Sequence, residues 1–219
     1  MISFLKKLEP NKLKAKSYPS SRAKLTTGHG KLNGGMTYVE LIVVLSIFSI
    51  MTSILLFDYN KFEAKVDIKV LANEIASKIV EAQKSAISGK WNVNAPLSWK
   101  PSYGIYFDLS SNKNFIYFAD LIQNNSYDSS SCSGTGECSD NISITKNNYV
   151  SRIDSYLGST PTPIANPLSI TFKRPNSSAI FSSNGILLTG FNYIQITISS
   201  PELISSTIKI YPSGRIQIN

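Results

Sequence analysis

Histidine is almost missing from this sequence of 219 residues. The single histidine, His29, lies close to the N-terminus. Beyond residue 35, mechanisms that need a histidine base, a histidine ligand or a Ser-His or Cys-His pair are therefore excluded. Cysteine is scarce as well, with Cys132 and Cys138 alone, and two thiols without histidine are too few to hold zinc. We expect no metal, no cofactor and no enzyme activity, although chemistry by carboxylates alone stays open.

Acidic residues are nearly absent from the first 35 positions, where Glu9 stands against eight of the 22 basic residues. These are Lys6, Lys7, Lys12, Lys14, Lys16, Arg22, Lys24 and Lys31. The other 184 residues carry 14 basic and 13 acidic side chains, so most of the net charge of +8 belongs to the N-terminal segment. A body so close to neutral gives little electrostatic support for DNA binding.

Long hydrophobic runs are also absent, with one exception at residues 41–57, which contain no charge, proline or glycine. Together with residues 36–39 this run is about 22 residues long, and roughly 20 are needed to cross a bilayer. The sequence predicts one transmembrane helix over residues 36–57, in contact with membrane lipid. The basic segment before this helix is expected in the cytoplasm, and the residues after it are expected outside. A cleaved secretory signal and a plain signal anchor are the alternatives.

Glu40 is the residue that a plain anchor does not explain. A carboxylate at the centre of a span costs about 2.5–3.5 kcal/mol on insertion scales, less near the interface, and such residues usually have a partner. No basic residue lies within helical reach downstream. If the chain is cut between Gly35 and Met36, a new amino group appears four residues before Glu40. The carboxylate then has a cation to pair with, in its own or a neighbouring subunit.

The segment from Asn33 to Leu41, Asn-Gly-Gly-Met-Thr-Tyr-Val-Glu-Leu, resembles the prepilin signature of type IV pilins and type II secretion pseudopilins. The resemblance covers about residues 31–60. It implies that a prepilin peptidase cleaves after Gly35 and methylates the amine of Met36. It also implies that Glu40, with Thr37 nearby, serves assembly by pairing with the N-terminus of another pilin or pseudopilin subunit.

Glycine and proline are absent from residues 36–88, and Gly89 then provides a natural helix end. An apolar stripe with helical spacing continues past the membrane and is expected to pack on a globular domain. Its members are Ala64, Ile68, Leu71, Ile75, Ile79, Ala82 and Ala86. A weaker apolar face carries Phe62, Val66, Val70, Val80 and Ile87.

Charged residues lie in rows on the same helix, with Glu63, Asp67, Glu74 and Glu81 in one row and Lys61, Lys65 and Lys69 in another. One interpretation is a solvated surface with local pairs such as Glu74–Lys78 and Glu81–Lys84. The other is that acidic and basic rows of adjacent subunits face each other in a filament.

After Gly89 the apolar period shortens toward two and turn residues become frequent, which predicts a head of short antiparallel strands. The expected strands are 103–108, 115–120, 142–145, 149–153, 168–172, 179–182, 193–198, 207–211 and 215–218. The sequence thus predicts an α+β protein in four parts. They are a cleaved cytoplasmic basic leader (1–35), a transmembrane and assembly helix (36–57), its amphipathic continuation (58–89) and a β-rich head (90–219).

Cys132 and Cys138 flank a segment rich in serine and glycine. We expect them to form a disulfide, which persists in an exported domain and contributes about 2–3 kcal/mol in a small loop. A set of aspartates is expected at turns, although a glycosidase would need two carboxylates to converge. These aspartates are Asp108, Asp120, Asp128, Asp140 and Asp154.

The head resembles the GspH/FimT family of minor pilins and pseudopilins through its strand density, Ile170–Pro175, Gly185 and Ile210–Arg215. Some members of that family carry a C-terminal Gly-Arg-x-Arg motif linked to DNA binding. Gly214 and Arg215 match the motif, but Gln217 replaces the second arginine. Arg215 is thus a candidate DNA contact, against the alternative of a solvated or paired side chain.

Three functions are therefore compared. The first is a structural subunit of a type IV pilus or type II secretion filament, held in the inner membrane until it assembles at the cell surface or in the periplasm. The second is a filament-borne module that binds DNA or another surface ligand. The third is a signal-anchored surface enzyme, which would need neither Gly35 nor Glu40.

Overall fold

The computed structural model describes residues 35–128, 132 and 136–219, apart from the side chains of residues 56–58 and 60. The predicted leader therefore lies outside the described residues, except for Gly35. The chain divides into two compact units, Met1–Ser46 and Ile47–Asn219, and each is described by itself.

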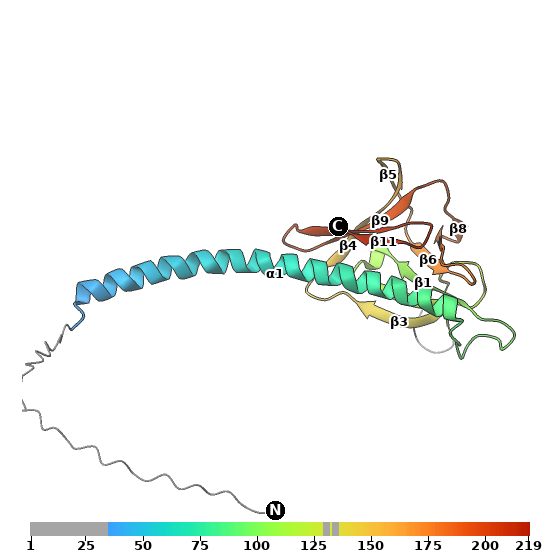
Figure 1. The fold of residues 1–219 in the computed structure, drawn as a ribbon, viewed down its shortest axis with the longest axis horizontal. Helices are drawn as coiled ribbons and strands as arrows, with labels where there is room; N and C mark the ends of the chain where they lie inside the picture. Colours follow the sequence, from blue (N-terminus) through green and yellow to red (C-terminus); the bar gives the residue numbers. More distant parts are fainter. Residues whose placement is uncertain (1–34, 129–131, 133–135) are drawn as a thin grey trace, which may run out of the picture. The chain divides into compact units, whose positions relative to one another are not determined.

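Helix α1 comprises the 51 residues Tyr38–Ser88 (Figure 1). It ends where the sequence predicts, because Gly89 follows with a left-handed φ of 63°. Gly89 N donates to Ala86 O at 3.1 Å and Lys90 N donates to Ser85 O at 3.0 Å. These two bonds satisfy carbonyl groups of the last turn, which is the usual reason for glycine after a helix.

The head contains two antiparallel sheets. The first has the strand order β3-β2-β1-β6-β7-β8, and its strands are β1 (Ser102–Phe107), β2 (Asn114–Asp120), β3 (Cys138–Ser143), β6 (Leu168–Phe172), β7 (Ala179–Ser183) and β8 (Ile186–Leu187). The second has the order β11-β10-β9-β4-β5, with strands β4 (Tyr149–Leu157), β5 (Thr160–Pro163), β9 (Tyr193–Ser199), β10 (Ser205–Ile210) and β11 (Ile216–Ile218). A short 3-10 helix, Leu109–Ser111, joins β1 to β2. The protein is therefore α+β with antiparallel sheets.

All nine predicted strands are present, although the strand predicted at 149–153 continues to Leu157, and three further corrections apply. The strand predicted at 142–145 begins earlier, at Cys138, and ends at Ser143. Strand β5 was not predicted because it contains Pro161 and Pro163, which cannot donate ladder hydrogen bonds. It is tolerated because it lies at the edge of its sheet and pairs with β4 alone. Strand β8 has two residues and gives too short a pattern to detect.

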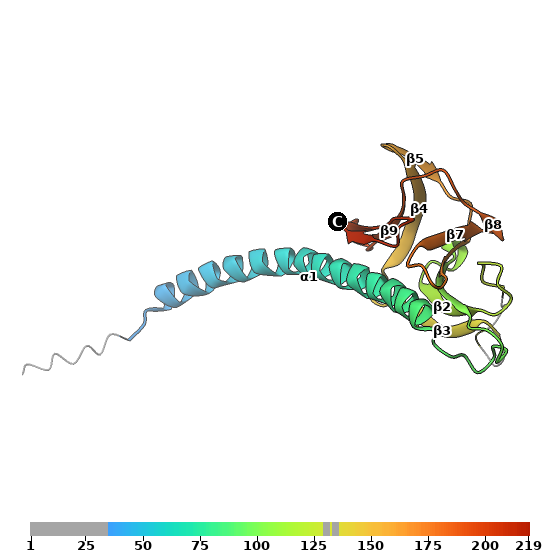
Figure 2. The same ribbon diagram turned by 45° about the vertical axis from the view of Figure 1, so that its right-hand side comes forward.

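The C-terminal half of α1 runs alongside the sheets in both views (Figures 1 and 2) and shares one hydrophobic core with them. Ile68, Ile75 and Ile79 are at most 1% exposed, which confirms the predicted stripe. Burying each such side chain contributes about 1.5–3 kcal/mol. On the weaker face Phe62 and Val70 remain exposed, at 66% and 59%.

Gln83 connects this part of α1 to two separate loops of the head. Its side-chain nitrogen donates to Ser177 O at 2.8 Å and to Gly214 O at 3.2 Å. Gly214 has a φ of 83°, and a Cβ there would overlap Ser177 O and the Gln83 amide. Glycine is therefore required at this turn of the β10–β11 hairpin both for its conformation and for the close approach of the helix.

Candidate functional site: the N-terminal segment and the charged contacts of the head

The first turn of α1 brings together the residues that the sequence singles out. Gly35 and Met36 precede the helix, and Thr37 caps it, since its hydroxyl oxygen accepts a hydrogen bond from Glu40 N at 3.2 Å. Glu40 thus lies in the first turn with an exposed side chain. An acidic residue is favoured there because the helix dipole is positive at its N-terminus.

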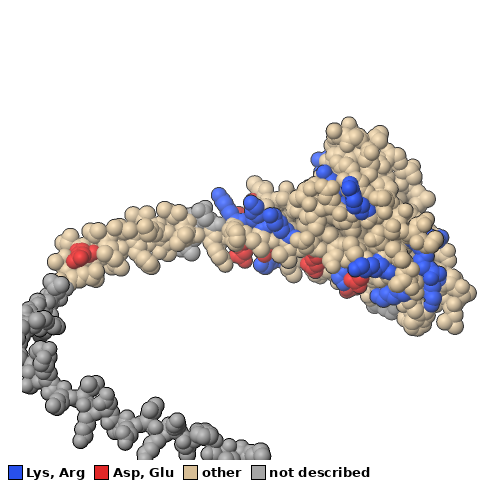
Figure 3. All heavy atoms as spheres, in the orientation of Figure 1, with Lys and Arg blue, Asp and Glu red and all other residues tan. Residues whose placement is uncertain are grey.

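One stretch of the described residues, Tyr38–Leu55, is long and apolar enough to cross a membrane, and none of it is buried. Glu40 is the sole charged residue between positions 36 and 57. Figure 3 shows this half of α1 as a largely uncharged surface. By length and composition the described part of the chain therefore contains one candidate membrane-spanning helix.

Two lysines form ion pairs between the C-terminal half of α1 and the head. Lys146 Nζ lies 2.7 Å from Asp67 and 3.6 Å from Glu63. The hydrogen bond that Lys146 donates to Asp67 raises the pKa of Lys146, assisted by the negative charges of Asp67 and Glu63. Lys78 Nζ lies 3.1 Å from Glu81 and 3.7 Å from Asp140 in β3. Because these pairs are solvated, each contributes little to stability, but both join α1 to a defined part of the head.

These contacts correct the predicted local pairs. Within the described residues no ion pair joins Glu74 to Lys78 or Glu81 to Lys84. Lys78 pairs instead with Glu81, three residues away, and with a strand of the head. Three members of the predicted acidic row, Glu63, Asp67 and Glu81, thus have a basic partner within the chain, which leaves less charge for the predicted contact between rows of adjacent chains.

Two buried carboxylates, Asp120 and Glu137, hold the loop that follows β2. Asp120 accepts hydrogen bonds from Asn124 N at 3.3 Å and Asn125 N at 2.9 Å. Glu137 accepts from Leu121 N at 2.9 Å and from Asp128 N at 3.0 Å. Burial raises the pKa of both carboxyl groups, and the backbone donors oppose the rise. The two groups therefore serve as structural acceptors.

The raised pKa values predict how stability depends on pH. The folded chain binds protons to Asp120 and Glu137 more readily than the unfolded chain, whose carboxyls titrate near their ordinary pKa of about 4. The contribution of these groups to the free energy of unfolding is therefore expected to fall as pH rises from about 4 to 7. Urea denaturation across this range should show a smaller fall in Glu137→Gln, which cannot titrate. An equal fall in both proteins would rule out this assignment.

The other aspartates take structural positions as well. Asp108 caps the 3-10 helix by accepting from Ser110 N at 2.8 Å, and hydrogen bonds from Asn166 and Ser110 overcome desolvation to lower its pKa. Asp140 and Asp154 were expected at turns, but they lie in β3 and β4. Asp154 is buried, and Arg152 Nε lies 2.7 Å from its carboxylate.

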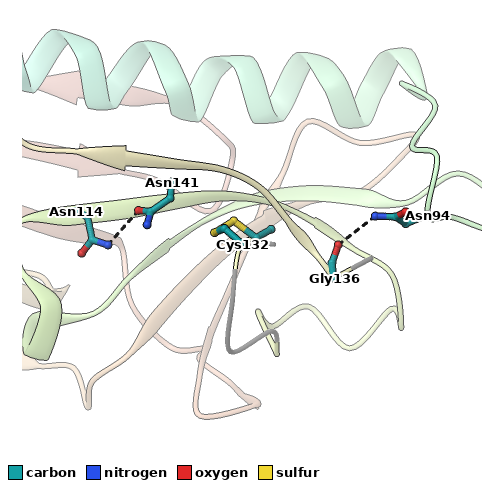
Figure 4. The surroundings of a disulfide bond; sticks show 6 residues. Asn94, Asn114, Cys132, Gly136 and Asn141 are labelled. Carbon is teal, nitrogen blue, oxygen red and sulfur yellow. Dashed lines mark hydrogen bonds between the residues drawn. A yellow bond between two sulfur atoms is a disulfide. The ribbon is translucent and has the colours of Figure 1, made fainter. Parts of the chain in front are cut away.

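Cys132 and Cys138 form the predicted disulfide, which closes the loop leading into β3 (Figure 4). Two hydrogen bonds flank it. Asn94 donates to Gly136 O at 3.4 Å, and Asn114 in β2 donates to the Asn141 side chain in β3 at 3.0 Å. The bridge therefore anchors the start of β3, where it stabilises the loop by restricting the unfolded chain.

Arg215 lies in the turn of the C-terminal hairpin, immediately before β11, with its guanidinium carbon 3.9 Å from the centroid of the Tyr211 ring. The Tyr211 hydroxyl in turn donates to the Gln217 side chain at 3.3 Å. Gln217, which stands where the family motif has its second arginine, is thus a hydrogen-bond acceptor in this chain. The stacking favours the structural alternative for Arg215 and gives no support for a DNA contact.

Comparison with known proteins returns no matching family model, curated protein or solved structure. Sequence reasoning found Gly35, Met36, Thr37 and Glu40 through their spacing before an apolar run. It missed Lys146 and its partners, because no local pattern indicates that a loop lysine will meet a helix 79 residues away.

Proposed function

We propose that this chain is a structural subunit, a minor pilin or pseudopilin, of a type IV pilus or type II secretion filament. In this role it carries out no catalysis. Prepilin peptidase removes residues 1–35 and methylates Met36, and the mature chain then joins other subunits through the first half of α1. Before assembly it is held in the inner membrane by one span, with the head outside.

The observation that carries the proposal is the position of Glu40. It is the one charged residue of an otherwise apolar stretch, four residues after Met36, and Thr37 fixes it in the first helical turn. The helix dipole favours an acid in the first turn, but in a plain membrane anchor the carboxylate has no cation to pair with. A subunit whose α-amino group is released by cleavage has a cation within reach, so the acid becomes useful for pairing between subunits.

The remainder of the molecule is compatible with this role. The apolar stretch ends before the part of α1 that packs on the head, so one helix supplies both a membrane segment and a support for the sheets. The disulfide suits an oxidising compartment outside the cytoplasm. The basic residues before Gly35 favour a cytoplasmic N-terminus. These features support the pilin-like arrangement of helix and head.

Cleavage tests the proposal directly. In cells that contain prepilin peptidase, we expect the membrane-bound chain to begin at methylated Met36, as read by N-terminal sequencing and intact mass. Gly35→Val is expected to remain uncut, because the peptidase signature that the segment resembles needs glycine immediately before the cut. Gly34→Val, one residue earlier, is the matched control and should be processed.

A protein that retains its first 35 residues in those cells would refute the proposal. It would favour the signal-anchored surface protein instead, for which neither Gly35 nor Glu40 has a role. Cleavage at a different position would indicate an ordinary secretory signal.

A further inference from the structure

A cleft of about 590 Å³ lies on the head where α1 ends. Four separate segments line it: the last turn of α1, the loop before β1, the loop after β2 and the β6–β7 loop. They contribute Ile87, Trp99, Lys100, Gln123, Lys173 and Arg174, among others. Its volume falls within the range of about 300–1,000 Å³ that is usual for small-molecule sites.

The cleft contains three cations and no carboxylate. Lys100, Lys173 and Arg174 are all exposed, and none of the three forms an ion pair within the described part of the chain. Lys78, Lys146 and Arg152, elsewhere in the same unit, each have an acidic partner. Figure 3 shows Lys and Arg side chains gathered on the head near the end of α1. An anion bound in the cleft would therefore meet these cations without a competing carboxylate among the lining residues.

Arg174 lies against the backbone of the helix end. A Cβ at Gly89 would lie 2.6 Å from an Arg174 guanidinium nitrogen, so the guanidinium occupies the space that glycine leaves. Helix α1 has no basic residue in its last turn. Arg174 therefore places a positive charge at the negative end of the helix dipole, which favours this position. The planar group therefore lies beside the cleft, where it can bind a carboxylate or phosphate with two hydrogen bonds.

The other wall is partly apolar. Trp99 is half-buried, Pro101 is buried and Ile87 is 44% exposed, while the Gln123 amide adds a polar group. An aromatic ring beside amide and hydroxyl groups suits the mixed surface of a sugar better than a lipid chain. A long polyanion is disfavoured, since the body carries almost no net charge and the cations lie in one cleft.

We propose that this cleft binds a sugar that carries phosphate or carboxylate groups. Two sources share this chemistry, a free sugar phosphate and the acidic residues of a surface glycan. Arg174 and the two lysines bind the anionic groups, and Trp99 packs against the ring. The site does not depend on cleavage at Gly35 or on assembly, so it is tested apart from the filament role.

The test measures binding to the purified full-length protein in detergent at low salt, by calorimetry and by fluorescence of Trp91 and Trp99. The probes are fructose 1,6-bisphosphate, for the free source, and oligogalacturonate, for the glycan source. Saturable binding of either probe supports the proposal and identifies the source. Affinity is expected to fall at least tenfold in the double variant Lys100→Gln with Lys173→Gln, which leaves Arg174 and the helix end untouched.

Lys65→Gln combined with Lys69→Gln is the control, because both lysines lie on α1 outside the cleft, and its affinity should remain within twofold of the parent. Arg174→Lys keeps the charge but loses the planar guanidinium that can form two parallel hydrogen bonds. We therefore expect its affinity to lie between those of the parent and the double variant. Absence of binding by both probes, or equal affinity in parent and double variant, would overturn the proposal. Duplex DNA that binds in place of the sugars and is lost in the double variant would overturn it in favour of a nucleic-acid site.

Discussion

Glu40→Gln is expected to reduce incorporation of this chain into filaments at least about tenfold while leaving its amount in the membrane unchanged. The substitution keeps the size of the side chain and removes its charge, so in the proposed filament the α-amino group of Met36 on the same or a neighbouring subunit would lose its partner. Breaking a buried pair costs about 3–5 kcal/mol. Near the membrane interface water lowers this cost, and about 1.4 kcal/mol already corresponds to a factor of ten.

The measurement compares sheared filament fractions with membrane fractions by quantitative immunoblotting. Glu74→Gln is the matched control, because Glu74 lies on the same helix, is exposed and has no ion pair among the described residues. It should assemble as the parent does. Normal assembly of Glu40→Gln would show that the acid has no role between subunits and would remove the main support for the proposed function.

Ile79→Ala is expected to lower the free energy of unfolding by about 2–5 kcal/mol. Ile79 is fully buried in the core that α1 shares with both sheets, so the truncation leaves a cavity between the helix and the head. For a domain of this size each kcal/mol shifts the melting temperature by about 2–4 °C. Thermal and urea denaturation of the full chain in detergent, followed by the fluorescence of Trp91 and Trp99, measure the loss.

Val70→Ala provides the comparison for Ile79→Ala. Val70 lies on the same helix but is 59% exposed, so its truncation is expected to change stability by no more than about 0.5 kcal/mol. Equal effects of the two substitutions on the free energy of unfolding would mean that the C-terminal half of α1 does not pack on the head in solution.

The helix end and its buried stripe could be predicted from the sequence because both are local. Gly89 is the first residue after Met36 that favours a left-handed conformation at no cost, and the apolar steps of three and four fall on one helical face. Strands with alternating patterns, such as Leu168–Phe172, could be found for the same reason. Strand β5 could not, since its prolines are acceptable at a sheet edge and edges are not visible in sequence.

The candidate sites divide in the same way. Gly35, Met36 and Glu40 are recognised by their spacing in a single segment, and the structure adds that Thr37 caps the turn between them. The basic cleft draws Lys100, Gln123 and Arg174 from three loops. No pattern in the sequence brings these residues together, because their meeting depends on how the loops pack against the end of α1.

The sequence by itself determined where the helix begins to be apolar, where it stops and which of its faces is buried, because helical periodicity is a property of one segment. The tertiary structure alone decided the partners of the charges. Lys146 meets Asp67 and not a neighbour on its own loop, and Asp120 and Glu137 are buried among backbone donors. Desolvation and ion pairing depend on what surrounds a side chain in space, so they are settled only when distant parts of the chain come into contact.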